Sequence, residues 1–357
     1  MIRILHVFHE MNNGGIEHFV MDYYRHIDRS QVQFDFLTSV DREGYFDKEI
    51  LALGGRLFRA YPLKKNPIRC FFDIASIIKK NNYSIIHRHT GSAFGYFDLR
   101  AAKHGGARHL IMHSHNNRAG NTALHYICNL LFRVKCEKLA CSKEAGEWLF
   151  GKKAAVKVIN NAIDGKAFQY QESSRQKIRA ELDVSDKFVV GHIGRFEDQK
   201  NHRFLLDIFE AVAERKKNAV LVLVGDGSLL EGIRREAKTK GILDRIIFMG
   251  TQKETAKLYN MFDVFVLPSK YEGFGITLLE AQTNGLHCYT SAHVVPQTVN
   301  ISGNIKYISL EESPEKWAEE ITEGNCREVI GTDVIKQAGF DISENAKQLL
   351  AYYKTMI

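Results

Sequence analysis

Short apolar runs alternate with amphipathic stretches along nearly the whole chain of 357 residues. The amphipathic stretches have the spacing of helices, and the apolar runs are rich in the β-branched and aromatic residues that favour strands. Strands that alternate with helices are typical of βαβ units, so the pattern predicts an α/β protein with parallel sheets. The predicted strands lie at 2–8, 33–39, 85–87, 109–113, 139–142, 188–194, 220–225, 246–250, 264–269 and 286–291.

The alternating pattern is interrupted once, by a polar stretch at 169–176 and a short helix, before a new series of strands starts at Phe188. A chain of this length also exceeds what one hydrophobic core usually serves. We therefore predict two domains, at 1–166 and 167–340.

The composition, with 45% hydrophobic and 25% charged residues, is that of a globular protein. No apolar run approaches the roughly 18 residues that span a bilayer, and Met1 leads into the first strand without a signal-peptide pattern. The six cysteines contain no C-x-x-C pair and predict reduced thiols. Together these observations predict a cytoplasmic protein.

The positive charge is concentrated in the N-terminal half. Residues 1–166 contain 25 Lys and Arg against 15 Asp and Glu, whereas the rest of the chain contains 24 against 27. Within this half, the stretch 56–80 mixes basic and apolar residues and could lie on the anionic inner face of the plasma membrane. The alternative is a solvated helix whose apolar side packs into the core. No nucleic-acid recognition motif accompanies the charge, so we expect no nucleic-acid partner.

Two loops after predicted strands have residues suited to a diphosphate. Gly14 and Gly15 open a helix, so backbone N–H groups can approach an anion there, although a plain turn is the alternative. Arg195 and Lys200 follow Gly194 and precede the next helix. A guanidinium can clamp phosphate oxygens and an ammonium adds a point charge, whereas two solvated loop charges are the alternative.

A third loop has two carboxylates, Glu272 and Glu280, eight residues apart. Gly273 and Gly275 permit close approach of the backbone to a ligand, and the amides of 274–277 open the following helix. Carboxylates bind vicinal hydroxyls well because each oxygen accepts a strong hydrogen bond. This loop is therefore suited to a sugar.

Several motifs follow one another along the chain: G-G-x-E at 14–17, H-S-H-N at 113–116, A-C-S-K-E-A at 140–145, V-I-N-N-A-I-D at 158–164, G-R-x4-K-N at 194–201, G-D-G at 225–227 and E-G-F-G-x4-E at 272–280. In this order they resemble the family 4 glycosyltransferases of GT-B fold, especially bacterial enzymes that assemble capsular and exopolysaccharide repeat units. The resemblance implies two Rossmann-like domains with parallel sheets facing a central cleft. It also implies that the last segment, here 341–357, crosses back to the N-terminal domain, which would bind the acceptor.

The resemblance assigns roles to residues of these motifs. Arg195 and Lys200 would hold the donor diphosphate and stabilise it as leaving group, Glu272 would bind the transferred sugar and Glu280 the ribose. His113 would contact the sugar or orient the acceptor. Further donor-binding residues would be Gly14, Gly15, Gly194, Phe274, Gly275, Ile276 and Thr277, and further acceptor or donor contacts Glu17, His115, Asn116 and Asn161.

We expect neither a cofactor nor a metal. The pairs His87/His89 and His113/His115 have a spacing that could bind a metal, but no carboxylate supports them and the chain lacks Asp-x-Asp. The family pattern is altered at Ala162, where glycine is usual, and at His287, where proline is common. Near Ala292, His293 and Gln297 an acidic residue is often found.

The sequence thus predicts a retaining, metal-independent glycosyltransferase. Its partners would be a nucleotide-sugar donor, most simply a UDP-sugar, and a glycan or lipid-linked saccharide acceptor of cell-surface polysaccharide biosynthesis. Two alternatives stay open: a UDP-sugar 2-epimerase of the same fold, and a non-enzymatic basic binding module.

Overall fold

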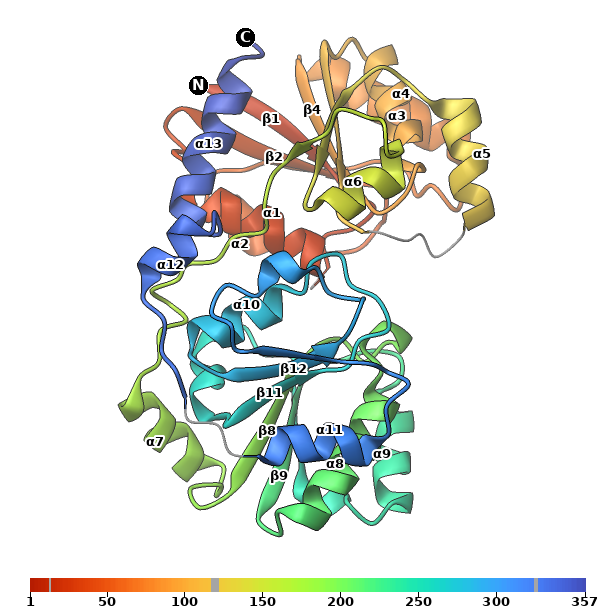
Figure 1. Ribbon diagram of the computed structural model, residues 1–357. Coiled ribbons are helices and arrows are strands. Elements are labelled where there is room, and N and C mark those ends of the chain that lie inside the picture. Colours follow the sequence, from red (N-terminus) through yellow and green to blue (C-terminus); the bar gives the residue numbers. More distant parts are fainter. Residues whose placement is uncertain (13, 117–121, 324–326) are drawn as a thin grey trace. The chain divides into compact units, whose positions relative to one another are not determined.

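The computed structural model describes residues 1–357 except 13, 117–121 and 324–326 (Figure 1). Its contacts divide the chain into two compact units. The N-terminal unit comprises residues 1–162 and 339–357, and the C-terminal unit comprises residues 163–338. The sequence pattern predicts these divisions after residues 166 and 340.

The N-terminal unit is built on a parallel sheet of seven strands in the order β3-β2-β1-β4-β5-β6-β7. This order places β1 and β4 side by side in the middle, and the strands that follow each of them extend the sheet in opposite directions. The strands are β1 (Ile2–Val7), β2 (Val32–Thr38), β3 (Leu57–Arg59), β4 (Ile85–Thr90), β5 (His109–Ser114), β6 (Glu137–Ala140) and β7 (Lys157–Val158).

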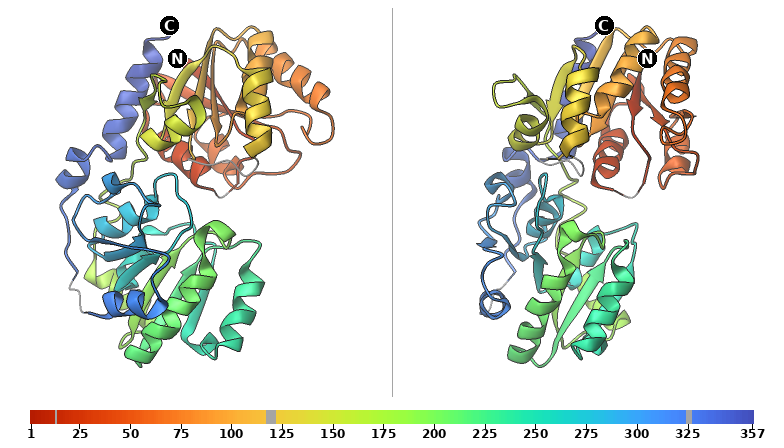
Figure 2. Two further views of the ribbon diagram at one scale, coloured as in Figure 1. Left: turned by 45° about the vertical axis from the view of Figure 1, so that its right-hand side comes forward. Right: turned by 90° about the vertical axis from the view of Figure 1, so that its right-hand side faces the viewer.

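Helices cover both faces of this sheet. One core contains Phe19 and Tyr24 of α1 together with Leu349 and Tyr353 of α13, so the last helix packs against the N-terminal unit (Figures 1 and 2). A second core joins the opposite face to α3 and α4. The helices of this unit are α1 (Gly15–His26), α2 (Asp47–Ala52), α3 (Pro67–Lys80), α4 (Gly95–His104), α5 (Thr122–Phe132), α6 (Lys143–Phe150) and α13 (Ile342–Lys354).

The C-terminal unit has a parallel sheet of six strands in the order β10-β9-β8-β11-β12-β13. Its core joins one face of the sheet to α8, α9 and the buried Trp317 of α11. The strands are β8 (Phe188–Ile193), β9 (Ala219–Val224), β10 (Ile246–Gly250), β11 (Val264–Leu267), β12 (His287–Ser291) and β13 (Ile305–Ile308). The α-helices are α7 (Glu172–Glu181), α8 (His202–Arg215), α9 (Leu230–Thr239), α10 (Ile276–Thr283), α11 (Pro314–Thr322) and α12 (Thr332–Gln337), and 3-10 helices lie at Asp198–Lys200, Leu243–Arg245, Ala256–Met261 and Gln297–Val299.

The predicted α/β fold with parallel sheets is confirmed, and each predicted strand corresponds to a strand of the structure. The analysis missed β3, β7 and β13, each of which has no more than four residues. All three lie at the edge of a sheet. An edge strand is partly solvated, so its sequence lacks the continuous apolar run of a buried parallel strand.

The basic and apolar stretch 56–80 forms β3 and α3. Ile74 of α3 is buried, and Phe71 and Ile77 pack partly buried against the core, whereas Phe72 is 55% exposed. The core therefore takes most of the apolar side of this helix. Within the described residues, no helix is both long and apolar enough to cross a membrane.

Candidate active site

The loops that follow β8 and β11 meet in the C-terminal unit, because these two strands pair in the middle of the sheet. The chain continues from β8 to one side of the sheet and from β11 to the other. Ligands of open α/β sheets bind beyond the carboxyl ends of strands at such a point. The loop after β8 contains Gly194, Arg195 and Lys200, and the loop after β11 contains Glu272 and Gly275.

Lys200 and Glu272 form an ion pair, with Lys200 Nζ 2.6 Å from Glu272 Oε1. Their side chains are only 17% and 7% exposed. The Ser269 hydroxyl donates a second hydrogen bond to the same carboxylate oxygen, at 2.7 Å. A carboxylate held by an ammonium and a hydroxyl is fixed in place, and its partly buried position strengthens both interactions.

The two loops are also joined through Gln199. Its side-chain amide donates to the Tyr271 carbonyl at 2.9 Å. The backbone carbonyl of Gln199 accepts from the Lys270 backbone N–H at 2.8 Å. Neither Gln199 nor Ser269 is predicted as a site residue from the sequence. The partners of Gln199 lie on the other loop, whereas Ser269 donates to Glu272 within its own loop.

Arg195 belongs to the same loop as Lys200, and its side chain is exposed. Among the residues that the structure describes, no ion pair or hydrogen bond engages its guanidinium. Gly225 lets the loop after β9 approach the loop after β8, and it has a φ of +139°. A Cβ at Gly225 would lie 2.1 Å from the Gly194 carbonyl oxygen, so only glycine fits there. This contact explains the first glycine of the G-D-G motif.

Helix α10 begins directly after Gly275, whose φ of +87° favours glycine. Thr277, in the first turn, has a buried hydroxyl without a hydrogen-bond partner among the described residues. Further along the helix, Glu280 accepts a hydrogen bond of 2.5 Å from the Tyr259 hydroxyl. Burial, together with the Glu280 carboxylate, raises the pKa of Tyr259 well above its usual value, so the phenol keeps its proton and donates it. Tyr259 had not been identified from the sequence.

In the N-terminal unit, Gly14 is the N-cap of α1 and Gly15 is the first residue of this helix, which follows the central strand β1. Gly15 is exposed, and a Cβ there would meet no atom within 4 Å. A Cβ at Gly14 would lie 2.5 Å from Glu17 Oε2. Glu17 therefore lies against the glycine turn, as the spacing of the motif requires.

Five histidines gather on one face of the same sheet, beneath α1 and α13: His6, His87, His89, His113 and His115. Their rings form two hydrogen-bonded rows. In the first, His6 Nδ1 lies 2.9 Å from His89 Nε2, and His89 Nδ1 lies 2.9 Å from His115 Nε2. In the second, His87 Nε2 lies 3.1 Å from His113 Nδ1, and His87 Nδ1 lies 2.7 Å from the Tyr353 hydroxyl.

These imidazoles are neutral at pH 7. Burial lowers the pKa of His6 and of His115 to about 3, and it lowers the pKa of His87, His89 and His113 well below 6.5. Two trios, His6/His87/His89 and His89/His113/His115, offer nitrogen atoms within 4.8 Å of one another, a spacing open to a metal ion. Within these trios, hydrogen bonds between ring nitrogens join His6 to His89 and His89 to His115.

His113 lies on β5 and is fully buried. Its side chain has 0% exposure and its Nε2 has no hydrogen-bond partner among the described residues, so it contacts only the interior of the unit. His115 points to the same face but follows the end of β5, and it retains 6% exposure. Asn116 is exposed and Asn161 half-buried. A ligand at this edge of the sheet would therefore reach His115 before His113.

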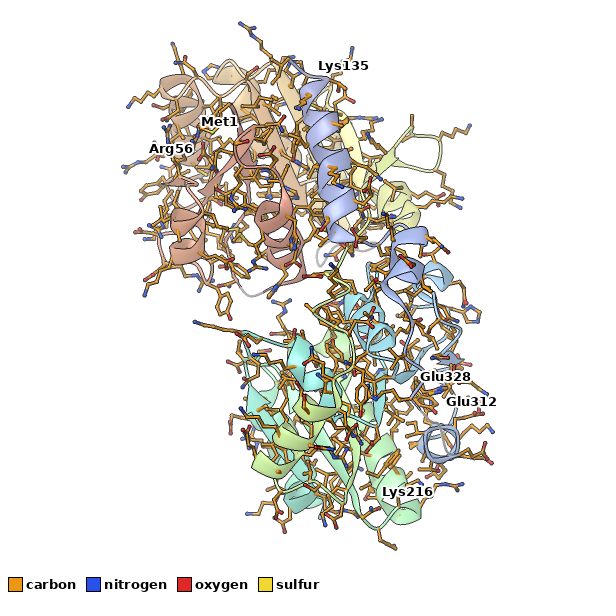
Figure 3. All side chains as sticks on the ribbon, turned by 90° about the vertical axis from the view of Figure 1, so that its left-hand side faces the viewer. Met1, Arg56, Lys135, Lys216, Glu312 and Glu328 are labelled. Carbon is orange, nitrogen blue, oxygen red and sulfur yellow. The ribbon has the colours of Figure 1, made fainter. Side chains whose placement is uncertain are left out.

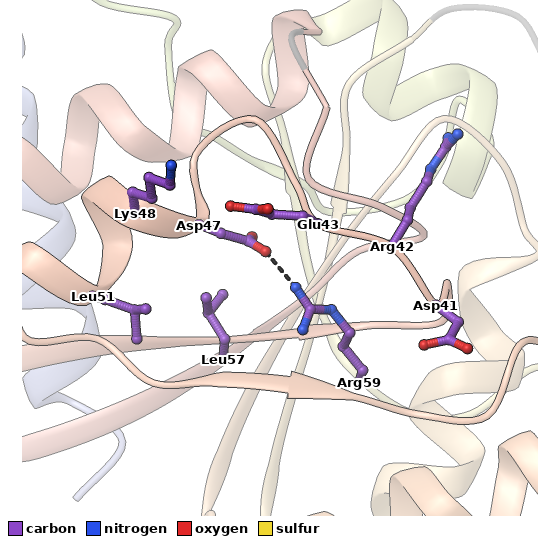
Figure 4. A pocket seen from close by; sticks show the side chains of 8 residues that line it. All are labelled: Asp41, Arg42, Glu43, Asp47, Lys48, Leu51, Leu57 and Arg59. Atoms are coloured by element: carbon purple, nitrogen blue, oxygen red, sulfur yellow. Dashed lines mark hydrogen bonds and ion pairs between the residues drawn. The ribbon is translucent and has the colours of Figure 1, made fainter.

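A separate hollow in the N-terminal unit is lined mainly by charged side chains (Figure 4). Arg59 and Asp47 pair across it at 2.5 Å. It contains none of the site residues predicted from the sequence. Its lining residues are Asp41, Arg42, Glu43, Asp47, Lys48, Leu51, Leu57 and Arg59.

Comparison with known families matches both parts of the chain. Residues 13–166 match the family model described as Glycosyltransferase Family 4, and residues 174–324 match the one described as Glycosyl transferases group 1. EpsF of Bacillus subtilis, whose name assigns it to the glycosyltransferases, is 35% identical over 98% of this chain and 96% of its own length.

Two further proteins are similar. A UDP-Gal:alpha-D-GlcNAc-diphosphoundecaprenol alpha-1,3-galactosyltransferase of Escherichia coli is 26% identical over 66% of this chain and 63% of its own length. The crystal structure of HepE from Anabaena in complex with UDP and glucose superposes with a TM-score of 0.81 at 18% identity, covering 99% of this chain and 100% of that one. This likeness shows a shared GT-B fold.

Proposed function

This chain belongs to the family 4 glycosyltransferases, and on that premise we propose that it is a retaining enzyme that transfers a sugar from a UDP-sugar to a saccharide acceptor. The observation that carries the proposal is the cluster of Lys200, Glu272 and Ser269 at the carboxyl ends of β8 and β11. An ammonium and a carboxylate lie side by side there, which supports the binding of a sugar diphosphate.

In the proposed reaction, an acceptor hydroxyl attacks the anomeric carbon on the face from which UDP departs. The C–O bond to the diphosphate breaks, the new glycosidic bond forms, and the leaving phosphate takes the hydroxyl proton. Arg195 and Lys200 stabilise the negative charge that develops on the diphosphate in the transition state. Such stabilisation by fixed charges is usually the largest single contribution to catalysis. Glu272 accepts hydrogen bonds from hydroxyls of the transferred sugar.

A metal ion has no part in this proposal, because the two side-chain cations supply the positive charge at the diphosphate. Glu280, held by Tyr259, would accept from the ribose hydroxyls. The amides that open α10 would add partial positive charge, because the N-terminus of a helix attracts anions. Every group named here lies in the C-terminal unit, so this unit would bind the donor.

A UDP-sugar donor and a lipid-linked acceptor are supported by the relatives. The name of the E. coli relative specifies UDP-Gal as donor and a sugar on diphosphoundecaprenol as acceptor. The HepE structures contain UDP with glucose, or UDP-glucose. We extend both features to this chain, with cell-surface polysaccharide biosynthesis as the setting.

We also propose a cytoplasmic protein that binds the inner face of the plasma membrane through its N-terminal unit. Helix α5 has no Asp, Glu, Lys or Arg, and most of its exposed side chains are apolar. The exposed lysine Lys135 follows it, and Lys135 and Arg56 lie on the surface of this unit (Figure 3). Apolar side chains next to basic ones favour an anionic lipid surface. The exposed residues of α5 are Thr122, Ala123, Leu124, Tyr126, Ile127, Leu130 and Leu131.

The test begins with a thermal-shift screen of nucleotide sugars, because a ligand that binds only the native state raises its stability. The donor found is then incubated with saccharide acceptors, and the anomeric configuration of the product is read by NMR. The same anomeric configuration in donor and product supports retention, and the opposite configuration in the product contradicts it. Incubation of the donor alone distinguishes the epimerase, which would convert the donor without an acceptor.

A further inference from the structure

His192 is a fully buried histidine near the end of β8, two residues before Gly194. Its Nδ1 lies 2.8 Å from the carbonyl oxygen of Val266 on β11. A carbonyl can only accept a hydrogen bond, so Nδ1 donates and has a proton. Burial lowers the pKa of His192 to about 4, so the ring is neutral at pH 7 and Nε2 has a lone pair.

This hydrogen bond lies where β8 and β11 separate. The last backbone pair between the two strands is Gly191 with Phe265. One residue further along each strand, the His192 side chain bonds the Val266 carbonyl instead. His192 therefore lies where the two loops of the candidate active site begin.

The lone pair on Nε2 of His192 has no hydrogen-bond partner among the residues that the structure describes. The His202 ring lies across it at 78°, with the ring centroids 4.7 Å apart, but no hydrogen bond joins the two rings. A buried acceptor without a donor is costly, because it has lost its hydrogen bonds to water. Such an atom is explained if a donor reaches it in another state of the site.

Lys200 is the cation beside this lone pair. A Cβ at Gly194 would lie 3.0 Å from His192 Nε2 and 3.2 Å from both Cγ and Cδ of Lys200. Nε2 and the Lys200 side chain therefore lie against the same point, and the ammonium is two bonds beyond Cδ. After the larger effect of burial, the positive charge of Lys200 also lowers the pKa of His192.

We propose that His192 is a positioning residue, whose Nε2 accepts a hydrogen bond from the Lys200 ammonium when a diphosphate is bound. This role rests on the proposed function, in which Lys200 contacts the donor diphosphate. An ammonium has three N–H donors. Glu272 engages one of them, a phosphate oxygen takes the second, and His192 Nε2 takes the third.

A neutral acceptor suits this position. A second carboxylate would cancel the positive charge of Lys200 and weaken its attraction for the diphosphate. The imidazole lone pair fixes the direction of the ammonium and leaves that charge in place. The Lys200 side chain is only 17% exposed, and a bound ligand excludes water from it, so the third N–H needs a protein acceptor.

Two amide variants separate the functions of the two ring nitrogens. Asparagine can place its NH2 group where Nδ1 lies and keep the bond to Val266, but it has no atom at the position of Nε2. Glutamine reaches that position and offers its amide oxygen there. We expect His192→Asn to weaken UDP binding about five-fold, the effect of one lost hydrogen bond, and His192→Gln to bind UDP within about two-fold of the native chain. Native affinity in His192→Asn, or an equal loss in both variants, overturns the role.

A double-mutant cycle, measured by calorimetry with UDP on the full chain, shows whether His192 acts through Lys200. In the presence of Lys200→Ala, the further change His192→Asn should alter the affinity less than about two-fold, because the ammonium is already absent. The same five-fold loss in both backgrounds would mean that His192 only supports the fold, and it overturns the role. His287→Asn, at the amino end of β12 in the same sheet, is the matched control and should bind UDP as the native chain does.

A crystal structure of the native chain with UDP needs no variant. It should place Lys200 Nζ about 3 Å from His192 Nε2. An ammonium that contacts the diphosphate but leaves Nε2 without a donor overturns the role. If the native chain binds no UDP, the proposed donor and this role fail together, whereas UDP binding that is indifferent to His192→Asn refutes the role of His192 alone.

Discussion

Lys200 Nζ lies 2.6 Å from Glu272 Oε1, although the two residues are 72 positions apart in the chain. The family resemblance assigned one to the diphosphate and the other to the sugar. Their contact means that the charge of each residue holds the other in place. A sugar diphosphate bound there would meet both charges at adjacent positions.

The first prediction concerns this pair. Lys200→Ala and Arg195→Ala should each lower kcat on the order of 10²-fold, because each change removes charge that stabilises the leaving diphosphate. Lys270→Ala is the matched control, since this lysine lies on the same loop as Glu272 but pairs with Asp198 at the surface. Steady-state kinetics on folded variants decides, and a normal kcat in Lys200→Ala would refute the role of the pair.

The second prediction concerns the contact between Gly225 and Gly194. Gly225→Ala should destabilise the protein by about 1–3 kcal/mol, because the added Cβ meets the Gly194 carbonyl oxygen and the residue has a positive φ. Gly232→Ala on α9 is the control, since a Cβ there meets no atom within 4 Å and alanine favours a helix. Urea denaturation of both variants is the measurement. Equal stability of the two would contradict the steric argument.

The third prediction is that transfer persists after treatment with EDTA. Arg195 and Lys200 would supply the charge that a metal provides in other transferases, so chelation should leave kcat unchanged. The control is a metal-dependent glycosyltransferase inactivated under the same conditions. Complete loss of activity that Mn²⁺ or Mg²⁺ restores would overturn the proposal.

The fourth prediction concerns acid. The folded protein holds His6 and His115 with a pKa of about 3, below the 6.5 of an unfolded histidine. Between these values the unfolded state binds more protons, so stability is present above pH 6.5 and is lost as the pH falls toward 3. Each such histidine should contribute a slope on the order of 1.4 kcal/mol per pH unit. Urea denaturation at pH 7, 6 and 5 measures it, and His6→Phe should have a shallower slope than the native chain.

The fifth prediction concerns the membrane. The native protein should float with vesicles of anionic phospholipid, and less so at high salt, because each basic residue near the surface adds about 1 kcal/mol before screening. Leu130→Glu should reduce flotation without unfolding the protein, since this side chain is 83% exposed. Replacing Lys64, Lys65, Lys79 and Lys80 by Glu tests the stretch 56–80 in the same way. Equal flotation of all variants, or none at all, would remove the membrane from the proposal.

The sequence by itself determined the class of fold and the family. Buried parallel strands are continuous apolar runs, and these are visible without coordinates, as at 264–269. The order of short motifs identified the glycosyltransferases, because glycines and charged residues at the ends of strands are constrained by local backbone and ligand chemistry. Gly275, with its positive φ before α10, is one such position.

Only the tertiary structure decided which of these residues meet. The pairing of Lys200 with Glu272, the hydrogen bond of Tyr259 to Glu280 and the contact of Gly225 with Gly194 all join distant segments. The same is true of the histidine rows. The sequence does not distinguish the two histidines of H-S-H, yet the structure buries His113 completely and leaves His115 at the edge of the sheet. The reason is physical. Local pattern determines which face a side chain occupies, whereas the pairing of strands and the packing of helices from elsewhere in the chain determine what lies against it.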